Sequence, residues 1–455
     1  MTGALVLYFA IVCPSLMLGQ TQSVSVPSTS NTRPCGTFSD HLIYKSAANL
    51  SEYPQAHLLV DLMSSRYRDL LWVADGYRLT NMPLVAYDGK SLFQPAPGDD
   101  PGLYYLIPAV SRVFRLGLER SIDLVLVSAL LLGFAVGFSG CLYALKSTAG
   151  KAVSLFALLL LTAIAYRTGD VYVFEFATTV ALVPWVLYLI RCKDGAHWTF
   201  QVSICMFGLI CGICSLIRFG SVLPVIAILA ILLPLSVRAR AGRKVALIVL
   251  FFVSFLIPRA YLRHLLTRSD AFVHQSVAGY RQADTRHVFG HFAYEGLGFL
   301  SNPYIPGGIC DEVAKEKVQA IAPGAAYMSS EYDHILQREV LSIAKQHPTI
   351  VAFTIFAKLG IIAGLIAVFA NVGLFAALCY PKSPQVEFAF WTAFAISSAP
   401  LVLMAPLPMY CLGVISLAVV YGIVSLDHCL VARKLTRLNP IQPQRIDDHA
   451  PVFVK

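Results

Sequence analysis

The chain has 455 residues, of which 57% are hydrophobic and only 13% are charged, and its mean hydropathy is +0.66. A composition this apolar excludes an ordinary soluble domain and indicates several membrane spans. The formal net charge of +9 is accounted for by basic residues that flank the expected spans, so it does not indicate a nucleic-acid partner.

The hydrophobic segments predict about ten membrane-spanning helices. A helix of about 20 residues crosses a hydrocarbon core of roughly 30 Å, and two of the segments, 152–166 and 221–236, are short for this. The expected fold is an all-α integral membrane protein with two large extracytoplasmic segments. The expected spans are 4–20, 122–145, 152–166, 173–190, 199–217, 221–236, 245–262, 350–379, 387–404 and 409–426.

The short loops carry most of their basic residues on one side. If the spans alternate, the opposite short loops carry only Arg167 and Arg218. The positive-inside rule makes the basic side cytoplasmic. We therefore expect a bacterial inner-membrane protein with its active side towards the periplasm, or an ER protein if the chain is eukaryotic. The basic side has Lys146, Lys151, Arg191, Lys193, Arg238, Arg240, Arg243, Lys244, Lys382, Arg433, Lys434 and Arg437.

This topology divides the chain into six parts. Residues 1–20 are either a retained first span or a cleaved signal peptide. We favour the span because the first basic residue is Arg33, so the basic start of a signal peptide is missing. The other parts are an outer segment (21–121), a six-helix membrane block (122–262), a second outer segment (263–348), a three-helix membrane block (349–426) and a basic cytoplasmic tail (427–455).

The first outer segment predicts helices at the membrane surface. Residues 55–73 place their leucines mostly along one helical stripe, which favours an interface helix. The stretch from Asp75 to Lys90 is rich in turn residues and is typical of loops or a hairpin. Residues 103–118 predict a second amphipathic helix that leads into the second span.

Two adjacent carboxylates precede this second helix. Asp99 and Asp100 stand in the turn Gly-Asp-Asp-Pro-Gly at 98–102, where proline and glycine favour a tight turn. Repulsion between close carboxylates raises the pKa of one of them, which suits a general base. The alternative is that both residues cap the helix and face solvent.

The second outer segment opens with a histidine-rich run at 287–299. His287, His291 and Glu295 are four residues apart, so on one helix they would share a face that could hold a divalent metal. Three glycines in the run argue against a regular helix. We therefore expect the histidines to form hydrogen bonds, and we expect no cofactor.

Two further helices are expected in this segment. One begins at Asp311 and ends near Ile321. Ser330 and Asp333 resemble a capping box that opens a helix to His347.

Only two of the eleven cysteines, Cys35 and Cys310, fall in the outer segments. In an oxidising compartment they can form a disulfide bond, and the alternative is two unrelated thiols.

Ionisable residues at the outer ends of spans are functional candidates. The planar guanidinium groups of Arg218 and Arg167 suit a phosphate. The alternatives are a structural pair between Arg167 and Asp170, and an Arg218 side chain that extends to the membrane interface. Lys358 lies about two turns inside its span and is expected to reach outward to an anion.

Taken together, these features resemble the GT-C class of membrane glycosyltransferases. Three segments resemble recurrent sequences of a bacterial group within that class: GDDPGLYYLIPAVSRVF at 98–114, HFAYEGLGFLSNPY at 291–304, and APGAAYMSSEYDHILQREVLSIAKQHP at 322–348. The resemblance extends from about residue 50 to 415. The chain departs from the better-known GT-C pattern because no acidic residue soon after the first span is an obvious match.

The resemblance implies an inverting transfer of sugar from a polyprenyl-phosphate donor to a glycan or lipid acceptor. Asp100 would be the general base, with Asp99 or Asp75 as alternatives. Cationic groups would stabilise the departing phosphate, and polar groups would hold the sugar or acceptor. The residues expected to bind the substrates are Arg218, Arg167, His291, Asp311, Lys358 and His287.

Two other classes of function remain open. One is a transporter or lipid-linked glycan flippase without transferase activity, although the spans show few buried charges and no inverted repeat. The other is a scaffold whose outer segments bind partners. A pocket at the membrane rim that combines Asp100, Arg218 and His291 would favour the enzyme.

Overall fold

The computed structural model describes residues 64–95, 100–168, 170–192, 198–237, 239–278, 280, 287–306 and 308–438. The expected first span, the candidate base Asp99 and Cys35 lie outside these residues. The described elements are almost all helical, and the two short strands form one antiparallel hairpin.

Nine described helices are long and apolar enough to cross a membrane, and they coincide with the nine expected spans that follow the first. The prediction of an all-α polytopic membrane protein is therefore confirmed. The nine are α5 (Leu118–Ala144), α6 (Thr148–Thr168), α7 (Val173–Cys192), α8 (Trp198–Ile217), α9 (Leu223–Ser236) with the preceding 3-10 turn η2 (Phe219–Val222), α10 (Ala241–Ser276), α14 (Pro348–Cys379), α15 (Pro384–Leu403) and α16 (Leu412–Leu438).

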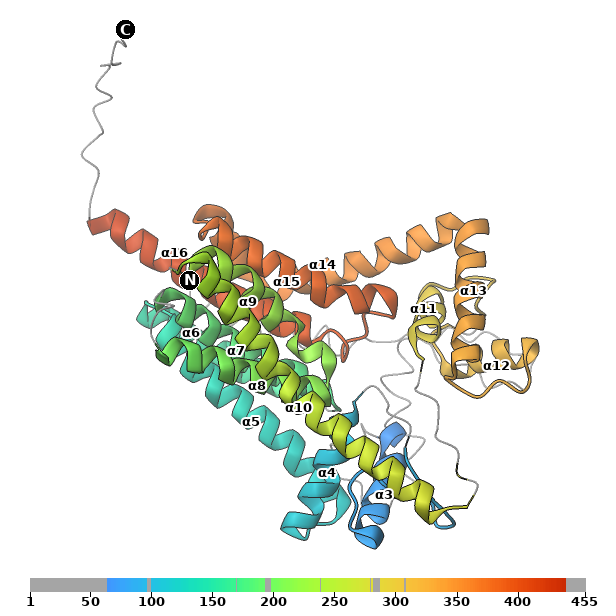
Figure 1. The fold of residues 1–455 in the computed structure, drawn as a ribbon. Coiled ribbons are helices and arrows are strands. Elements are labelled where there is room, and N and C mark those ends of the chain that lie inside the picture. The colour runs from blue at the N-terminus through green and yellow to red at the C-terminus, as the bar shows by residue number, and fades with distance from the viewer. Residues whose placement is uncertain are drawn as a thin grey trace, which may run out of the picture.

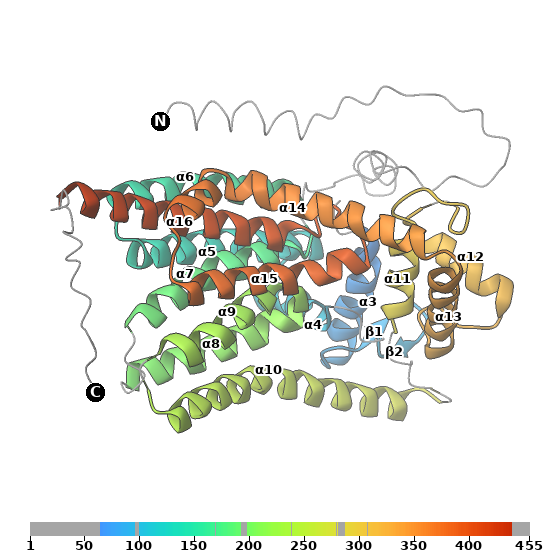
Figure 2. The same cartoon turned by 90° about the horizontal axis from the view of Figure 1, so that it is seen from above.

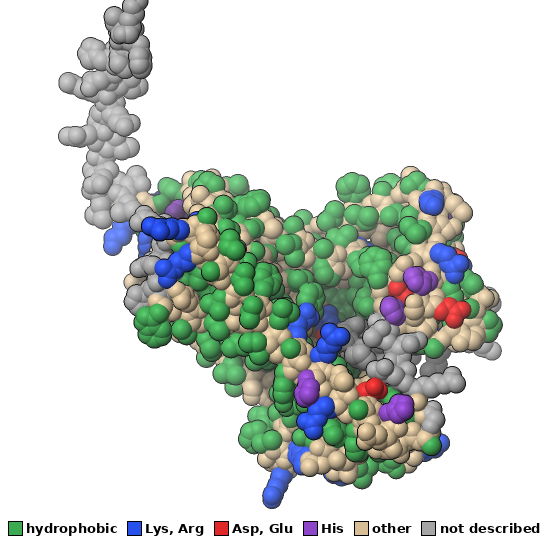
Figure 3. Space-filling model, viewed as in Figure 1, with side chains coloured by type: hydrophobic (Ala, Val, Ile, Leu, Met, Phe, Trp, Pro, Cys, Tyr) green, Lys and Arg blue, Asp and Glu red, His purple; other side chains and the backbone are tan. Residues whose placement is uncertain are grey.

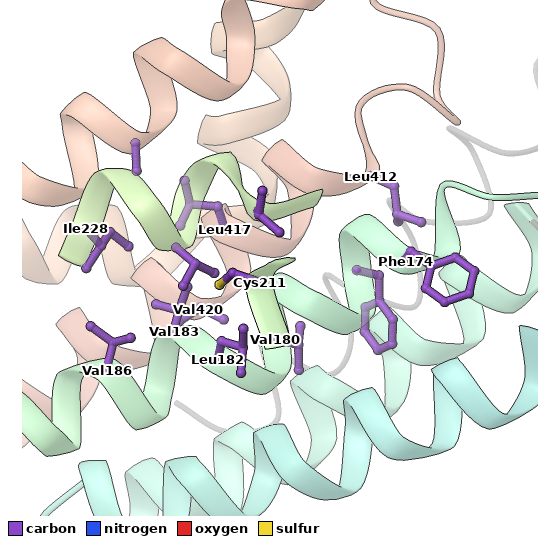
Figure 4. Close-up of a cluster of buried hydrophobic side chains, with 14 of the residues drawn as sticks. Phe174, Val180, Leu182, Val183, Val186, Cys211, Ile228, Leu412, Leu417 and Val420 are labelled. Carbon is purple, nitrogen blue, oxygen red and sulfur yellow. The ribbon is translucent and has the colours of Figure 1, made fainter. Parts of the chain in front are cut away.

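The membrane helices form one bundle in which α5 packs on α7, α8 on α10, α9 on α15 and α14 on α16 (Figure 1). The centre of the bundle is apolar: Val183, Cys211, Ile228 and Leu417 come from four helices and are all buried (Figure 4). Small residues allow the closest approaches, as in other membrane bundles. A side chain on Gly373 of α14, for example, would overlap the backbone of α16.

The short elements of both outer segments gather at one end of the bundle, and the last residues of α16 lie at the other end (Figure 2). From the first segment come α3 (Ser64–Thr80), β1 (Ala86–Tyr87), β2 (Leu92–Phe93) and α4 (Pro101–Phe114). From the second come α11 (Phe289–Leu297), α12 (Asp311–Ile321) and α13 (Ser330–Gln346). The two outer segments, which are far apart in the sequence, thus lie at the same end of the bundle.

Helix α10 joins the bundle to this outer layer. Its 36 residues extend about 54 Å at 1.5 Å per residue, well beyond a hydrocarbon core of roughly 30 Å. The helix therefore continues well past residue 262, where the expected membrane span ends. The projecting part supports the hairpin, because Gln94 donates hydrogen bonds to the carbonyl of Leu266 and the hydroxyl of Ser269.

Two expectations about glycines were wrong for one reason. Gly76 lies inside α3 rather than in a loop, and Gly290 and Gly296 lie inside a regular α11. Each of these glycines presses against neighbouring backbone, of Val85, Asp333 and Leu403 respectively, where a Cβ atom would not fit. Their role is close packing, which the helix tolerates at a modest cost.

The predicted hairpin and the two predicted helices of the second outer segment agree closely with the structure. Helix α3 ends seven residues after the expected interface helix, and α4 ends four residues before the expected end of the second helix. The hairpin β1–β2 lies in the turn-rich stretch, with Asp88 accepting hydrogen bonds in its turn. Helix α12 runs from Asp311 to Ile321 as expected. Helix α13 is capped by Ser329, one residue before the expected cap, because Asp333 accepts a hydrogen bond from Gly290 instead.

Candidate functional site

Two clusters of charged side chains lie at the outer end of the bundle. The first, here the rim cluster, consists of Asp100, Tyr172, Glu175 and Arg218. The second, the histidine cluster, consists of His291, Glu295, Asp311, Tyr327 and Tyr332.

Arg218 is the centre of the rim cluster. It follows α8 directly and caps the short turn η2. Its Nη1 lies 3.5 Å from Oδ1 of Asp100, and its Nε donates to Oε1 of Glu175 at 3.2 Å. The guanidinium carbon lies 4.3 Å from the centre of the Tyr172 ring, a cation–π contact. One arginine therefore ties together the starts of α4 and α7 and the end of α8.

Asp100 is held inside the protein rather than at its surface. It occupies the position before the first residue of α4, Pro101, but its side chain makes no capping hydrogen bond and is only 1% exposed. A side chain on Gly102 would meet Leu216 at 2.8 Å, so the start of α4 lies directly against the end of α8. This contact brings Asp100 close to Arg218. The alternative prediction, that Asp100 caps the helix and faces solvent, is therefore wrong.

Glu175 is buried in the first turn of α7 and is accommodated by two glycines. A Cβ atom on Gly220 would lie 3.0 Å from its Oε1, and one on Gly413 would lie 2.8 Å from its Oε2. Two carboxylates thus face one guanidinium group. A buried charge needs a partner of opposite charge. Arg218 already has two such partners, Asp100 and Glu175.

A further cation, Arg259, lies next to the rim cluster and was missed by sequence reasoning. Its guanidinium carbon on α10 lies 5.4 Å from the ring centre of Phe219, the residue after Arg218. Among the described residues Arg259 has no carboxylate partner. Arg259 lies near the outer end of a span, and the same kind of position made Arg218 a candidate from the sequence. On the face shown in Figure 3, Lys and Arg side chains border a recess between the bundle and the outer helices.

The histidine cluster joins α11, α12 and α13 around one buried ring. His291 is 1% exposed, and its Nε2 lies 3.1 Å from Oε1 of Glu295 and 3.5 Å from Oδ1 of Asp311. On the other side, its Nδ1 lies 3.0 Å from the hydroxyl of Tyr332. Tyr327 donates a hydrogen bond to Oδ2 of Asp311 at 3.2 Å.

The two carboxyl groups of this cluster differ in protonation. Burial, reinforced by the nearby Asp311, raises the pKa of Glu295 to about 9. The hydrogen bond from His291 lowers the pKa of Asp311 well below its usual range. At neutral pH Glu295 is therefore neutral and Asp311 is charged. Because the Asp311 side chain is 57% exposed, the cluster presents a carboxylate to solvent.

The same side chains could hold a divalent ion. Ligand atoms of His291, Glu295 and Asp311 lie within 4.8 Å of one another, and this donor set suits zinc or a similar metal. The sequence spacing suggested His287 as the third ligand in place of Asp311. His287 is exposed and precedes the first residue of α11. Metal binding would require Glu295 to lose its proton.

Tyr410 lies next to the rim cluster. Its ring centre is 4.8 Å from that of Tyr172, which contacts Arg218. Burial raises the pKa of Tyr410, and Glu295 adds to this rise while Arg218 opposes it. Tyr410 thus packs against the rim cluster from the loop between α15 and α16. The start of this loop also packs on α11, because Gly296 lies against the carbonyl groups of Leu403 and Met404.

Three other candidates occupy different surroundings. Asp75 pairs with Arg78 of the same helix, its Oδ1 3.2 Å from Nη2. Arg167 is exposed in the last turn of α6, whereas Asp170 is buried and accepts a hydrogen bond from the next backbone N–H. Their roles in catalysis and substrate binding remain predictions.

Lys358 is buried and points to the end of a neighbouring helix. Its ammonium group donates to the carbonyls of Val402 and Met404, at 2.9 and 2.8 Å, and lies 3.4 Å from that of Leu403. The last carbonyls of a helix carry partial negative charge, which a cation stabilises. These bonds hold the loop that carries Tyr410, and the anion-binding role expected for Lys358 remains a prediction.

Cys310, the residue before α12, is disulfide-bonded. Its partner lies outside the described residues, as does Cys35, the partner considered from the sequence. The cysteines with described side chains in the membrane helices are free.

The fold and its outer clusters define an all-α polytopic membrane protein with an ionisable site at one end of its bundle. No protein-family model and no curated protein matches the sequence. Among solved structures, the chain is similar to ArnT from Cupriavidus metallidurans in the apo state, at 14% identity, with 88% of this chain and 80% of that chain covered and a TM-score of 0.29. An overlap this low carries no argument about family or activity.

Proposed function

We propose that this protein is a membrane glycosyltransferase of the GT-C kind. It moves a sugar from a polyprenyl-phosphate donor to a hydroxyl group of a glycan or lipid acceptor on the outer side of the membrane. The observation that carries the proposal is the buried carboxylate of Asp100, 3.5 Å from Arg218 at the membrane rim. Tyr172 and Tyr410 extend this pair to the loop between α15 and α16, whose start packs on Gly296 of α11.

The chemical step is a direct displacement at the anomeric carbon. Asp100 accepts the proton of the acceptor hydroxyl as general base. The acceptor oxygen bonds to the anomeric carbon, and the bond from that carbon to the phosphate oxygen breaks. The polyprenyl phosphate leaves with the electron pair and an additional negative charge. Attack opposite the leaving group inverts the configuration.

The departing phosphate needs a cation that is not already neutralised. Arg218 faces both Asp100 and Glu175, so we assign it the positioning of the base. Arg259 lies beside it without a carboxylate partner among the described residues, and Arg167 is exposed at the same end of the bundle. These two arginines are our candidates for the phosphate.

The histidine cluster suits recognition of a sugar or an acceptor. The charged and half-exposed carboxylate of Asp311 accepts hydrogen bonds from hydroxyl groups, while Tyr327 and His291 fix its orientation. A preorganised carboxylate of this kind orients a substrate.

The test of the class uses purified protein in proteoliposomes, with native membranes as the source of acceptor. Labelled polyprenyl-phosphate hexoses are offered in parallel with labelled nucleotide sugars. We expect label to reach the acceptor from the lipid-linked donor alone. Transfer from the nucleotide sugar alone, or no transfer from any lipid-linked donor tested, would contradict the proposal.

A further inference from the structure

A cavity lies at the opposite end of the bundle, on the side that carries most basic loop residues. Its volume is about 520 Å³. It is lined by residues from the end of α5 and from α7, α9, α15 and α16. It is therefore separate from the two outer clusters.

Two of the charged residues that line this cavity already have partners within the protein. The ammonium group of Lys382 lies 2.6 Å from Oε1 of Glu387 and donates to Ser425. The carboxylate of Asp427 accepts hydrogen bonds from the backbone N–H groups of Lys146 and Ser147 and from the Ser147 hydroxyl. Neither group is left to bind a ligand.

Three other side chains of the lining remain available. Lys146 and Arg191 are exposed, and in the part of the chain that the structure describes neither has a carboxylate partner. Arg191 uses Nη1 to donate to the carbonyl of Ala144, which leaves its other donors. His428 is exposed beside them. The cavity thus offers an ammonium group, a guanidinium group and an imidazole ring to an anion.

The rest of the wall is apolar. Leu187 of α7, Leu232 and Leu235 of α9, and Val386 and Val424 line the cavity beside the basic groups. A site that joins cations to apolar side chains between membrane helices fits an amphiphile, with the anionic group at the cations and the hydrocarbon along the apolar wall. Basic pockets between membrane helices on the cytoplasmic side bind anionic lipid head groups.

We propose that this cavity binds the phosphate-bearing head group of an anionic phospholipid from the inner leaflet. Lys146 and Arg191 contact the phosphate, and the side chains from α7, α9, α15 and α16 contact the first part of the acyl chains. The site is independent of the proposed transfer reaction. Its occupation fixes the relative positions of the five elements that line it.

Native mass spectrometry of the purified full-length chain measures this binding. Phosphatidylglycerol is titrated against phosphatidylcholine with the same acyl chains. We expect the wild type to prefer phosphatidylglycerol. The double variant K146Q/R191Q should bind it about thirtyfold more weakly, because each of the two basic residues contributes about 1 kcal/mol of binding free energy to anionic lipid. The matched control R240Q/K434Q removes one arginine and one lysine outside the cavity and keeps the preference.

Three outcomes would overturn the proposal. The cavity variant could keep the full preference, or the control could lose as much as the cavity variant. Alternatively, inorganic phosphate could bind in the absence of lipid and be lost in the same variant, which would identify a soluble anion as the ligand. If the double variant does not elute as a single folded species, K146Q alone replaces it, because the Lys146 side chain is exposed and its removal leaves no buried group unpaired.

Discussion

The guanidinium group of Arg218 lies 3.5 Å from the carboxylate of Asp100. The sequence suggested a base and a phosphate-binding cation, and the fold brings these two residues into contact. With Glu175 on the other side of the guanidinium group, the arginine already contacts two carboxyl groups. Its part in the proposed reaction is therefore to hold the base, and the charge on the leaving group falls to other arginines.

Replacement of Arg218 should destabilise the protein. In R218Q two buried carboxyl groups lose the guanidinium group that faces them both, and breaking such a pair typically costs about 3–5 kcal/mol. We expect a clearly lower midpoint of thermal unfolding in detergent. Adding E175Q should recover part of the loss, because it removes one of the unpaired charges.

Arg167 provides the control for this experiment, since it is an exposed arginine at the same end of the bundle. R167Q should unfold within a degree or two of the wild type, because exposed substitutions usually change stability by less than about 0.5 kcal/mol. Equal midpoints for R218Q and R167Q would show that the rim cluster does not support the fold.

Arg259 should matter for the donor rather than for the fold. If it contacts the phosphate, R259Q loses charge stabilisation that grows as the lipid phosphate departs, and kcat/KM for the donor falls by about 10²-fold. R263Q, one turn further along the exposed face of α10, should retain activity. An R259Q enzyme with wild-type kinetics would remove Arg259 from the site.

The histidine cluster predicts a pH dependence of stability. The pKa of Glu295 is about 9 in the folded protein and near 4.5 as a free side chain. Between these values the folded state binds more protons than the unfolded state, so Glu295 makes stability fall as pH rises. Asp311, whose pKa is lowered, is ionised in both states throughout this range and adds no slope.

E295Q should therefore flatten the decline in unfolding midpoint between pH 6 and pH 9. E316Q, an exposed substitution of the same kind on α12, should leave the decline as in the wild type. Parallel curves for wild type, E295Q and E316Q would mean that Glu295 does not keep a proton in the folded protein.

The disulfide of Cys310 predicts a covalent link between outer segments. Cys35 is the cysteine that the sequence places on the same side of the membrane. Peptide mapping of non-reduced protein should identify a linked Cys35–Cys310 peptide that reduction separates. A linkage of Cys310 to any other cysteine would contradict the topology from which this pairing follows.

Sequence reasoning captured the features that depend on local patterns. The nine described spans, the hairpin and the bounds of α12 follow from hydropathy, turn residues and capping. Gly290 and Gly296 were misjudged because glycine marks both loops and close helix contacts, and only the neighbouring backbone decides between them. The contact of Asp100 with Arg218 depends on how α4 packs on α8, which no local pattern contains.

The same limit applies to the histidine cluster. His291 and Glu295 share a helix face, as their spacing predicts, but the third partner is Asp311 from the next helix rather than His287. Arg259 was overlooked although it lies near the outer end of an expected span. Its relation to Phe219 and Arg218 appears only once α8 and α10 are packed.

The role of Asp100 is the central claim, and the most direct measurement compares D100N with D75N in transfer of labelled sugar from the lipid-linked donor. D100N keeps the shape of the side chain and removes the base, whereas Asp75 pairs with Arg78 on α3. We predict that D100N lowers kcat by about 10²–10⁴-fold and that D75N retains most activity, with both proteins folded. Wild-type transfer by D100N would contradict the account.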